Sequence, residues 1–129
     1  MTKPQVKNLD RPDESREFPN GADALVTIGA HTIGRAEFRP GWRWSNDVQP
    51  VAGTASCQVH HLGYLMSGTL HVETDDGAHT DLVAGDAFEI LPGHDAWVVG
   101  DTACHLLDWP SAAVQPTQPK PAVASGTSA

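Results

Sequence analysis

The chain lacks the features that mark secreted and membrane-spanning proteins. Among its 129 residues are two cysteines, Cys57 and Cys104. They are too few for a disulfide framework, so both are expected as free thiols. The N-terminus carries no apolar signal segment, and the chain has no run of about 18 apolar residues that would span a bilayer. We therefore expect a soluble, cytoplasmic protein with no membrane partner.

Basic side chains are scarce where the fold is expected. Residues 21–109 contain three basic and twelve acidic residues, and the whole chain has a formal net charge of -8. Because such a surface repels phosphate groups, we expect no nucleic-acid partner. The nucleophile elbow of serine hydrolases is missing, as are the glycine-rich loops that bind phosphates or dinucleotides at the start of a helix. These enzyme classes are set aside.

An apolar stripe at helical spacing is also missing from the chain. Short runs rich in Val, Ile, Thr, Leu and aromatic residues alternate instead with glycine-bearing turns, a pattern typical of an all-β domain. Asp76 and Gly77 between two alternating segments predict a tight hairpin turn. The expected strands cover residues 24–28, 32–38, 57–66, 68–74, 79–83, 87–91, 95–99 and 102–109. Many short strands at this spacing predict a sandwich or closed barrel.

The composition divides the chain into one domain and two flanking segments. Residues 1–20 combine three prolines with mixed charges and predict an irregular N-terminal arm along the barrel edge. Residues 21–109 form the expected β-barrel, which is large enough for a single core. Residues 110–129 are rich in Pro, Ala, Ser and Thr without apolar periodicity. This segment predicts a disordered tail, because burial cannot offset its ordering entropy.

Two segments of the barrel region resemble the two conserved motifs of the cupin superfamily. They are GYLMSGTLHVETDDG, which ends at Gly77, and LVAGDAFEILPGHDAW, which ends at Trp97. The resemblance extends over residues 34–109. It implies a small single-domain jelly-roll β-barrel of the RmlC-like type with a site inside the barrel mouth. It also implies a homodimer.

The resemblance further implies a metal site, which the family builds from two histidines, a glutamate and a later histidine. His61 occupies the position of the glutamate, and Cys57 is the one good ligand near the positions of the first two histidines. Ala96 occupies the position of the last histidine, but His94 shares its strand parity two residues earlier. The scaffold therefore matches the family, whereas the usual ligand set is broken.

Cys57, His61 and His94 form the candidate metal set. Cys57 and His61 share strand parity with Leu65, so they face the barrel interior if Leu65 does. Residues four apart on a straight strand are ~13 Å apart, so joint ligation needs a bend. Thiolate and imidazole favour a divalent transition metal, Fe, Ni, Cu or Zn, over magnesium or calcium. The alternative is that these are packing and turn residues.

A candidate substrate pocket accompanies the metal set. Its residues are Trp42, Arg43, Trp44, Tyr64 and His105. The stretch with the two tryptophans is interpreted either as a lid over the barrel mouth or as ordinary packing. An arginine near an open pocket favours carboxylate-bearing ligands. His60 and His105 are reserve metal ligands, and His71 and His79 are expected as surface histidines on a hairpin.

Three functional hypotheses follow. The first, which the resemblance implies, is a metal-dependent dioxygenase, isomerase or decarboxylase acting on a small polar, carboxylate-bearing molecule. The second is a non-catalytic small-molecule-binding or sensor cupin whose barrel encloses an effector. The third is a structural or assembly module. The fold alone does not choose among them.

Overall fold

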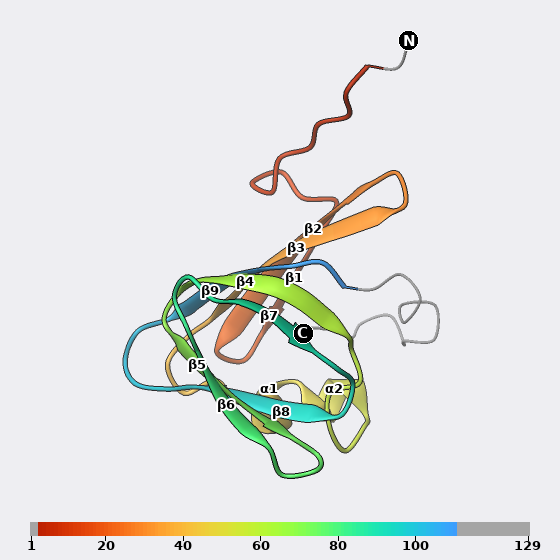
Figure 1. The fold of residues 1–129 in the computed structure, drawn as a ribbon. Helices are drawn as coiled ribbons and strands as arrows, with labels where there is room; N and C mark the ends of the chain where they lie inside the picture. The colour runs from red at the N-terminus through yellow and green to blue at the C-terminus, as the bar shows by residue number, and fades with distance from the viewer. Residues whose placement is uncertain (1–2, 111–129) are drawn as a thin grey trace.

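A computed structural model describes residues 3–110 of the chain. Within that range, nine strands form two antiparallel sheets that face each other, with two very short helices at one end (Figure 1). The predicted all-β architecture is confirmed. The predicted disordered tail falls almost entirely on residues 111–129, which lie outside the described residues, as do residues 1–2.

The larger sheet has six strands. Its spatial order is β1 (Glu14–Phe18), β2 (Gly21–Ile28), β3 (His31–Phe38), β9 (Cys104–Asp108), β4 (His61–Ser67) and β7 (Ala87–Ile90). Strand β9 pairs with β3 on one side and with β4 on the other. The last described strand is therefore central to this sheet, between segments that lie far apart in the sequence.

The smaller sheet has three strands, in the order β6 (His79–Val83), β5 (Thr69–Thr74) and β8 (His94–Val98). The β5–β6 hairpin turns at Asp76 and Gly77, where the predicted turn lies. Gly77 has a φ of 93°, a left-handed conformation that glycine adopts without strain. This sheet covers the opposite side of the interior from β4 and β9 (Figure 1).

The N-terminal arm differs from the prediction in one respect. Glu14–Phe18 is not irregular but forms β1, which pairs in register with β2 and makes one edge of the larger sheet. Arg16 bonds to Asp23 on β2 at 3.0 Å, and Phe18 packs partly against the core. Charged residues are tolerated here because an edge strand exposes one side to water. Composition alone did not separate this strand from a loop.

Two helices of four residues each interrupt the β structure between β3 and β4. They are α1 (Trp44–Asp47) and α2 (Gln49–Ala52), and α2 ends at Gly53 in the left-handed conformation, with a φ of 77°. In the described part of the chain, neither helix has the length and hydropathy that crossing a membrane requires.

Strand β4 shows how alternation positions the interior. His61, Gly63 and Leu65 are buried, whereas Leu62 and Tyr64 between them are exposed. A Cβ at Gly63 would lie 2.4 Å from the carbonyl oxygen of Leu107, so no larger residue fits there without movement. The inward residues of both sheets close over a single core, in which Leu65 and Cys104 have no exposed surface.

Candidate metal centre

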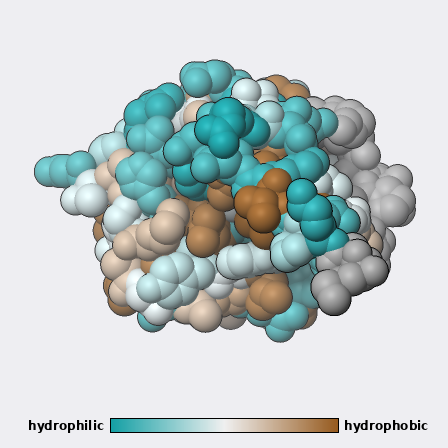
Figure 2. Space-filling view, turned by 90° about the horizontal axis from the view of Figure 1, so that it is seen from above, coloured by the Kyte–Doolittle hydropathy of each residue, from teal (hydrophilic) through white to brown (hydrophobic). Residues whose placement is uncertain are grey.

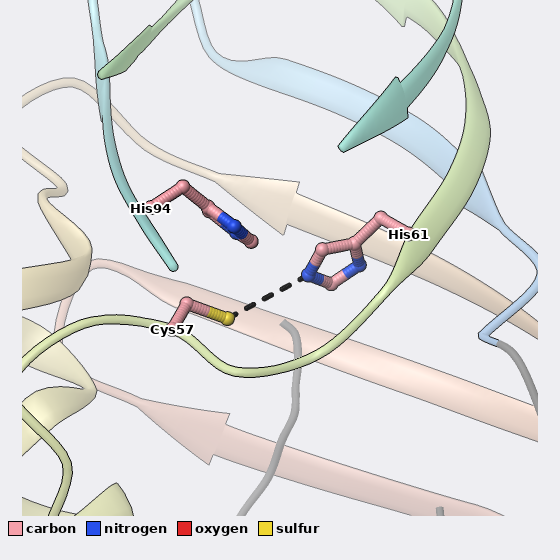
Figure 3. Close-up of side chains that lie close together, drawn as sticks. All are labelled: Cys57, His61 and His94. Atoms are coloured by element: carbon pink, nitrogen blue, oxygen red, sulfur yellow. Dashed lines mark hydrogen bonds between the residues drawn. The ribbon is translucent and has the colours of Figure 1, made fainter. Parts of the chain in front are cut away.

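Three buried side chains converge inside the barrel. Cys57, His61 and His94 each offer one ligand atom, and these atoms all lie within 4.8 Å of one another. The Sγ of Cys57 lies 3.7 Å from Nε2 of His61, and the two imidazole rings are 5.3 Å apart between centroids. Figure 3 shows the three side chains pointing toward one another from separate segments. The structure thus brings together the three residues that the sequence selected as a metal set.

Local backbone geometry explains how Cys57 and His61 approach each other. His61 is the first residue of β4, but residues 58–60 before it belong to no strand. Cys57 forms instead an isolated bridge to His94, with its amide donating to the His94 carbonyl at 2.7 Å. The bend that joint ligation requires is therefore present. It replaces the ~13 Å of a straight strand by direct contact.

Hydrogen bonds fix the orientation of both imidazoles. Nδ1 of His61 lies 2.6 Å from Oδ2 of Asp108 on β9, and Nδ1 of His94 lies 2.8 Å from the carbonyl oxygen of Leu91. Since the carboxylate and the carbonyl accept, both Nδ1 atoms donate. The Nε2 atoms are left for the centre of the cluster. Metal-binding histidines are held in this way by carboxylates and carbonyls.

Burial and neighbouring side chains shift the pKa values of His61 and Cys57 in the cluster. Burial opposes the charged form of His61, but the Asp108 carboxylate beside it outweighs this effect and raises the pKa of His61 to about 10. Burial likewise opposes a Cys57 thiolate, but hydrogen bonds from His61 and His94 lower the pKa of Cys57 to about 7. A thiolate is the form of cysteine that binds a metal. The environment therefore favours Cys57 as a ligand.

The donor set fits a divalent transition metal. One thiolate and two imidazole nitrogens suit zinc, iron, nickel or copper, whereas magnesium and calcium prefer oxygen. Three protein donors are one fewer than a closed structural zinc site uses. The cluster can hold a metal ion, and its chemistry alone does not select the element.

The reserve ligands lie outside this centre. His60 bonds through Nε2 to Glu89 at 2.8 Å on the exterior. His105 lies on β9 between buried Cys104 and Leu106, so it points outward, where it contacts Ser67 at 2.8 Å. Neither side chain reaches the interior, because each has the parity opposite to that of the buried residues.

The predicted substrate pocket is not assembled. Tyr64 is 42% exposed on the outer face of β4, and His105 also faces outward. Trp42 and Trp44 are buried at 3% and 2% exposure, and the Trp42 ring stacks on Phe38 with centroids 3.9 Å apart. The two tryptophans are therefore core residues rather than an exposed lid, because their large apolar rings gain more from burial than from solvent contact.

Arg43 also points away from the centre. Its side chain bonds to Asp95 at 3.1 Å, and its guanidinium lies 4.1 Å from the centroid of the Trp97 ring. Asp95 alternates along β8 with buried His94 and Ala96, so the pair is on the exterior. The Arg43 side chain therefore lies on the outer face of the smaller sheet.

Asp108 is the functional residue that the sequence analysis missed. It is 6% exposed and lies on β9 in the buried parity of Cys104 and Leu106. Its Oδ1 has no hydrogen-bond partner among residues 3–110, so the contact with His61 is its main compensation. An acidic residue at an inward position of an alternating strand indicates a buried partner, since such residues are seldom buried alone. This pattern could have identified Asp108.

Comparison with known proteins identifies the fold. No protein-family model and no curated protein matches the sequence. In structure, the chain is similar to an RmlC-like cupin from Shewanella frigidimarina (TM-score 0.57, 16% identity, covering 85% of this chain and 94% of that one). It is also similar to Rru_A2000 from Rhodospirillum rubrum, a cupin-2 domain (0.56, 16%, 93% and 72%).

A third neighbour is the polyketide cyclase RemF from Streptomyces resistomycificus (TM-score 0.58, 15% identity, covering 84% of this chain and 80% of that one). At identities this low, the similarity shows a shared fold and nothing about function. The chain has the fold of the small RmlC-like cupins over most of its length, as its two motifs predicted.

Proposed function

We propose that the protein is a metal-dependent cupin enzyme acting on a small polar, carboxylate-bearing molecule as an oxygenase, isomerase or decarboxylase. The observation that carries the proposal is the orientation of the two buried imidazoles. Nε2 of His61 lies 3.7 Å from the Cys57 sulfur, and His94 offers a ligand atom within 4.8 Å of both. Nδ1 of each ring is held from behind, by Asp108 or by the Leu91 carbonyl. Packing alone does not require two histidines with this shared orientation.

The protein side chains prepare the centre in three ways. Asp108 accepts a hydrogen bond from Nδ1–H of His61, which sets the tautomer and raises the basicity of the ligand. The Leu91 carbonyl does the same for His94. The surrounding barrel excludes water, which strengthens electrostatic interactions at the centre. When bound, the metal would supply Lewis-acid polarisation of a substrate oxygen or activation of a bound molecule.

Proton release accompanies metal binding in this proposal. The charged form of His61 carries a proton on Nε2, and that proton must leave before the nitrogen can bind a metal. Because the Asp108 carboxylate raises the pKa of His61 to about 10, metal binding competes with this proton. The apparent affinity is therefore expected to rise with pH across the neutral range.

A catalytic role gains support from one neighbour. RemF, whose fold this chain shares, is a polyketide cyclase, so this architecture does support an enzymatic activity. The competing proposal is a non-catalytic small-molecule binder or sensor. It is favoured by Ala96, a buried apolar residue at the position where the family places its last histidine.

Elemental analysis of untagged protein purified without added metal tests the proposal. About one iron, nickel, copper or zinc ion per chain is expected at the interior centre, and His94→Ala is expected to lose it while keeping the His61–Asp108 pair. His60→Ala, which removes the partly exposed neighbour of His61, is the matched control and should retain the ion. A metal-free protein that also fails to take up added metal would contradict the proposal and favour the binder.

The proposal extends to a homodimer with a small-molecule partner. Leu62, Tyr64 and Met66 on β4 are 56%, 42% and 39% exposed, and Trp109 after β9 is 38% exposed. Figure 2 looks down on the side where the larger sheet lies in Figure 1 and shows apolar atoms within a mostly hydrophilic face. Exposed apolar side chains grouped in this way are typical of an interaction surface.

Sedimentation analysis tests the dimer. The wild-type chain is expected to sediment as a dimer, and Tyr64→Glu with Met66→Glu as a monomer of unchanged fold. A monomeric wild-type protein would contradict this part of the proposal. The acidic surface favours a small molecule over nucleic acid as the partner, and the cytoplasmic location stays a prediction.

A further inference from the structure

A second pair of histidines lies on the outer face of the smaller sheet. His71 on β5 and His79 on β6 approach each other, with Nε2 of His71 2.7 Å from Nδ1 of His79. Each occurs opposite a carboxylate in the strand register: His71 pairs with Asp81, and His79 pairs with Glu73. Four metal-ligating side chains therefore meet on one exposed hairpin, where the sequence predicted ordinary surface histidines.

In each ring, a carboxylate lies near the nitrogen that faces away from the other histidine. Oδ1 of Asp81 lies 2.5 Å from Nδ1 of His71, and Oε2 of Glu73 lies 3.4 Å from Nε2 of His79. Because a carboxylate only accepts, Nδ1 of His71 carries a proton, and Nε2 of the neutral ring presents its lone pair toward His79. Nδ1 of His79 donates to this lone pair in the neutral pair. A divalent metal ion that displaces this proton would bind the same two nitrogens.

The surroundings preorganise this pair. The His71 ring packs against Trp97 on β8 with centroids 4.5 Å apart, and the Arg43 guanidinium lies over the same indole, 4.1 Å from its centroid. His71 is thereby held on one side, while the side chain of His79 is 51% exposed and free to adjust. Two nitrogen ligands of one ion at 2.0–2.1 Å are about 3.3 Å apart, so a small opening of the pair suffices.

We propose that His71 and His79 form a second site for a divalent transition-metal ion, on the outside of the barrel. Nε2 of His71 and Nδ1 of His79 are its donors, and Asp81 and Glu73 orient the two rings and offset the charge. With two protein donors, the remaining coordination positions are open to water or to a soluble ligand. Imidazole donors favour copper, nickel or zinc.

This site is separate from the interior centre. Along β8, His94 faces the interior and Trp97 faces outward, and His71 alternates on β5 with the buried residues Leu70 and Val72. The sheet itself therefore lies between the two groups. The outer site depends on no part of the proposed interior chemistry and can be tested without it.

Copper(II) is a suitable probe, because a paramagnetic ion at His71 should quench the fluorescence of the adjacent Trp97. In a Cys57→Ala/His61→Ala background, which removes two of the three interior donors, Cu²⁺ titration followed by calorimetry and fluorescence is expected to show one ion per chain with quenching. Adding His79→Ala should weaken binding at least tenfold. His31→Ala, at an exposed histidine on β3, is the matched control and should leave it unchanged.

Two further measurements keep the test decisive. Trp97→Phe should retain the ion and lose the fluorescence response. If the double background does not fold, the wild-type chain is titrated instead. Two ions per chain are then expected, falling to one in His79→Ala. If the interior proposal fails, one ion is expected in the wild-type chain and none in His79→Ala. Equal Cu²⁺ binding by the His79→Ala variant and its parent would overturn the outer site in every case.

Discussion

The inner and outer faces of the barrel wall both carry a histidine bonded to an aspartate. The two bonds have nearly the same length, 2.6 Å for His61–Asp108 inside and 2.5 Å for His71–Asp81 outside. Inside, both side chains are 8% exposed, whereas outside the histidine is 20% and the aspartate 57% exposed. Water screens the outer pair and not the inner one. Burial rather than bond length therefore decides how much each pair contributes to folding and to ligand orientation.

The sharpest test of this comparison removes one carboxylate from each face. Asp108→Ala removes the carboxylate that compensates the buried charge of His61, so the imidazole must stay charged without this partner or give up its proton. The free energy of unfolding should fall by about 3–5 kcal/mol. Asp81→Ala removes the partner of a partly exposed histidine, and a loss of about 1 kcal/mol or less is expected. Urea denaturation of the metal-free proteins at neutral pH measures both values.

A conservative variant separates charge from hydrogen bonding at the inner face. Asp108→Asn keeps an acceptor for the Nδ1 proton of His61 but removes the negative charge, so it should destabilise less than Asp108→Ala. Equal losses for Asp108→Ala and Asp81→Ala would show that burial does not distinguish the two faces.

Strand β4 offers the same comparison with apolar side chains. Leu65 is fully buried, and Leu62, three residues earlier on the same strand, is 56% exposed. Leu65→Ala should cost about 2–5 kcal/mol through lost burial and a residual cavity. In the monomeric Tyr64→Glu/Met66→Glu variant, in which the outward face of β4 stays uncovered, Leu62→Ala should remain within about 0.5 kcal/mol of its parent. Urea denaturation measures both losses, and similar values at the two positions would contradict the comparison.

The smallest expected effect is the pH dependence of the wild-type free energy of unfolding, because two opposed titrations in the inner cluster cancel. The pKa of His61 is raised from 6.5 to about 10, so its stabilising contribution is present below pH 6.5 and is lost as the pH rises toward 10. The pKa of Cys57 is lowered from 9.0 to about 7. Its contribution is present above pH 9 and is lost as the pH falls through 7. Between pH 7 and 9 the two slopes oppose each other, so the stability of the metal-free wild type should change little.

Cys57→Ala should reveal the slope of His61 alone. Because the Asp108 contact persists in this variant, the free energy of unfolding should fall by up to about 1.4 kcal/mol per pH unit between pH 7 and 9. Urea denaturation at several pH values in the presence of a chelator measures this slope, and His60→Ala serves as the control. A flat profile in the Cys57→Ala variant would refute the opposed titration of the two groups.

The sequence was sufficient for the main lines of the fold. Parity along the predicted strand put His61 on the same face as Leu65, and both are buried. The Asp76–Gly77 signal placed the β5–β6 turn where it occurs. The same parity argument excludes Tyr64 from the interior, since it alternates with Gly63 and Leu65, yet Tyr64 was included in the candidate pocket. Strand β1 was missed because a polar edge strand carries no apolar alternation strong enough to distinguish it from a loop.

The sequence predicted which residues belong to the candidate site, but not how they come together. Cys57, His61 and His94 were selected from motif positions and ligand chemistry, but their convergence depends on the bend at residues 58–60 and on the bridge between Cys57 and His94. Asp108 is 47 residues from its partner His61, and no local pattern connects the two. A lid was one interpretation of Trp42 and Trp44, because composition does not tell whether an aromatic ring is buried in the core or exposed.

The amino-acid sequence by itself determined the all-β class, the β5–β6 turn and the parity of the strands that it predicted, because these follow from patterns between residues close in the chain. Tertiary structure decided which distant strands became neighbours, and so it decided the partners of the buried histidines. The pairing of β9 with β4 sets Asp108 behind His61, and the β5–β6 register sets His71 against His79. The first contact depends on long-range pairing of strands, which residue-by-residue patterns do not encode, whereas the second lies within one hairpin and depends on the register that its turn sets.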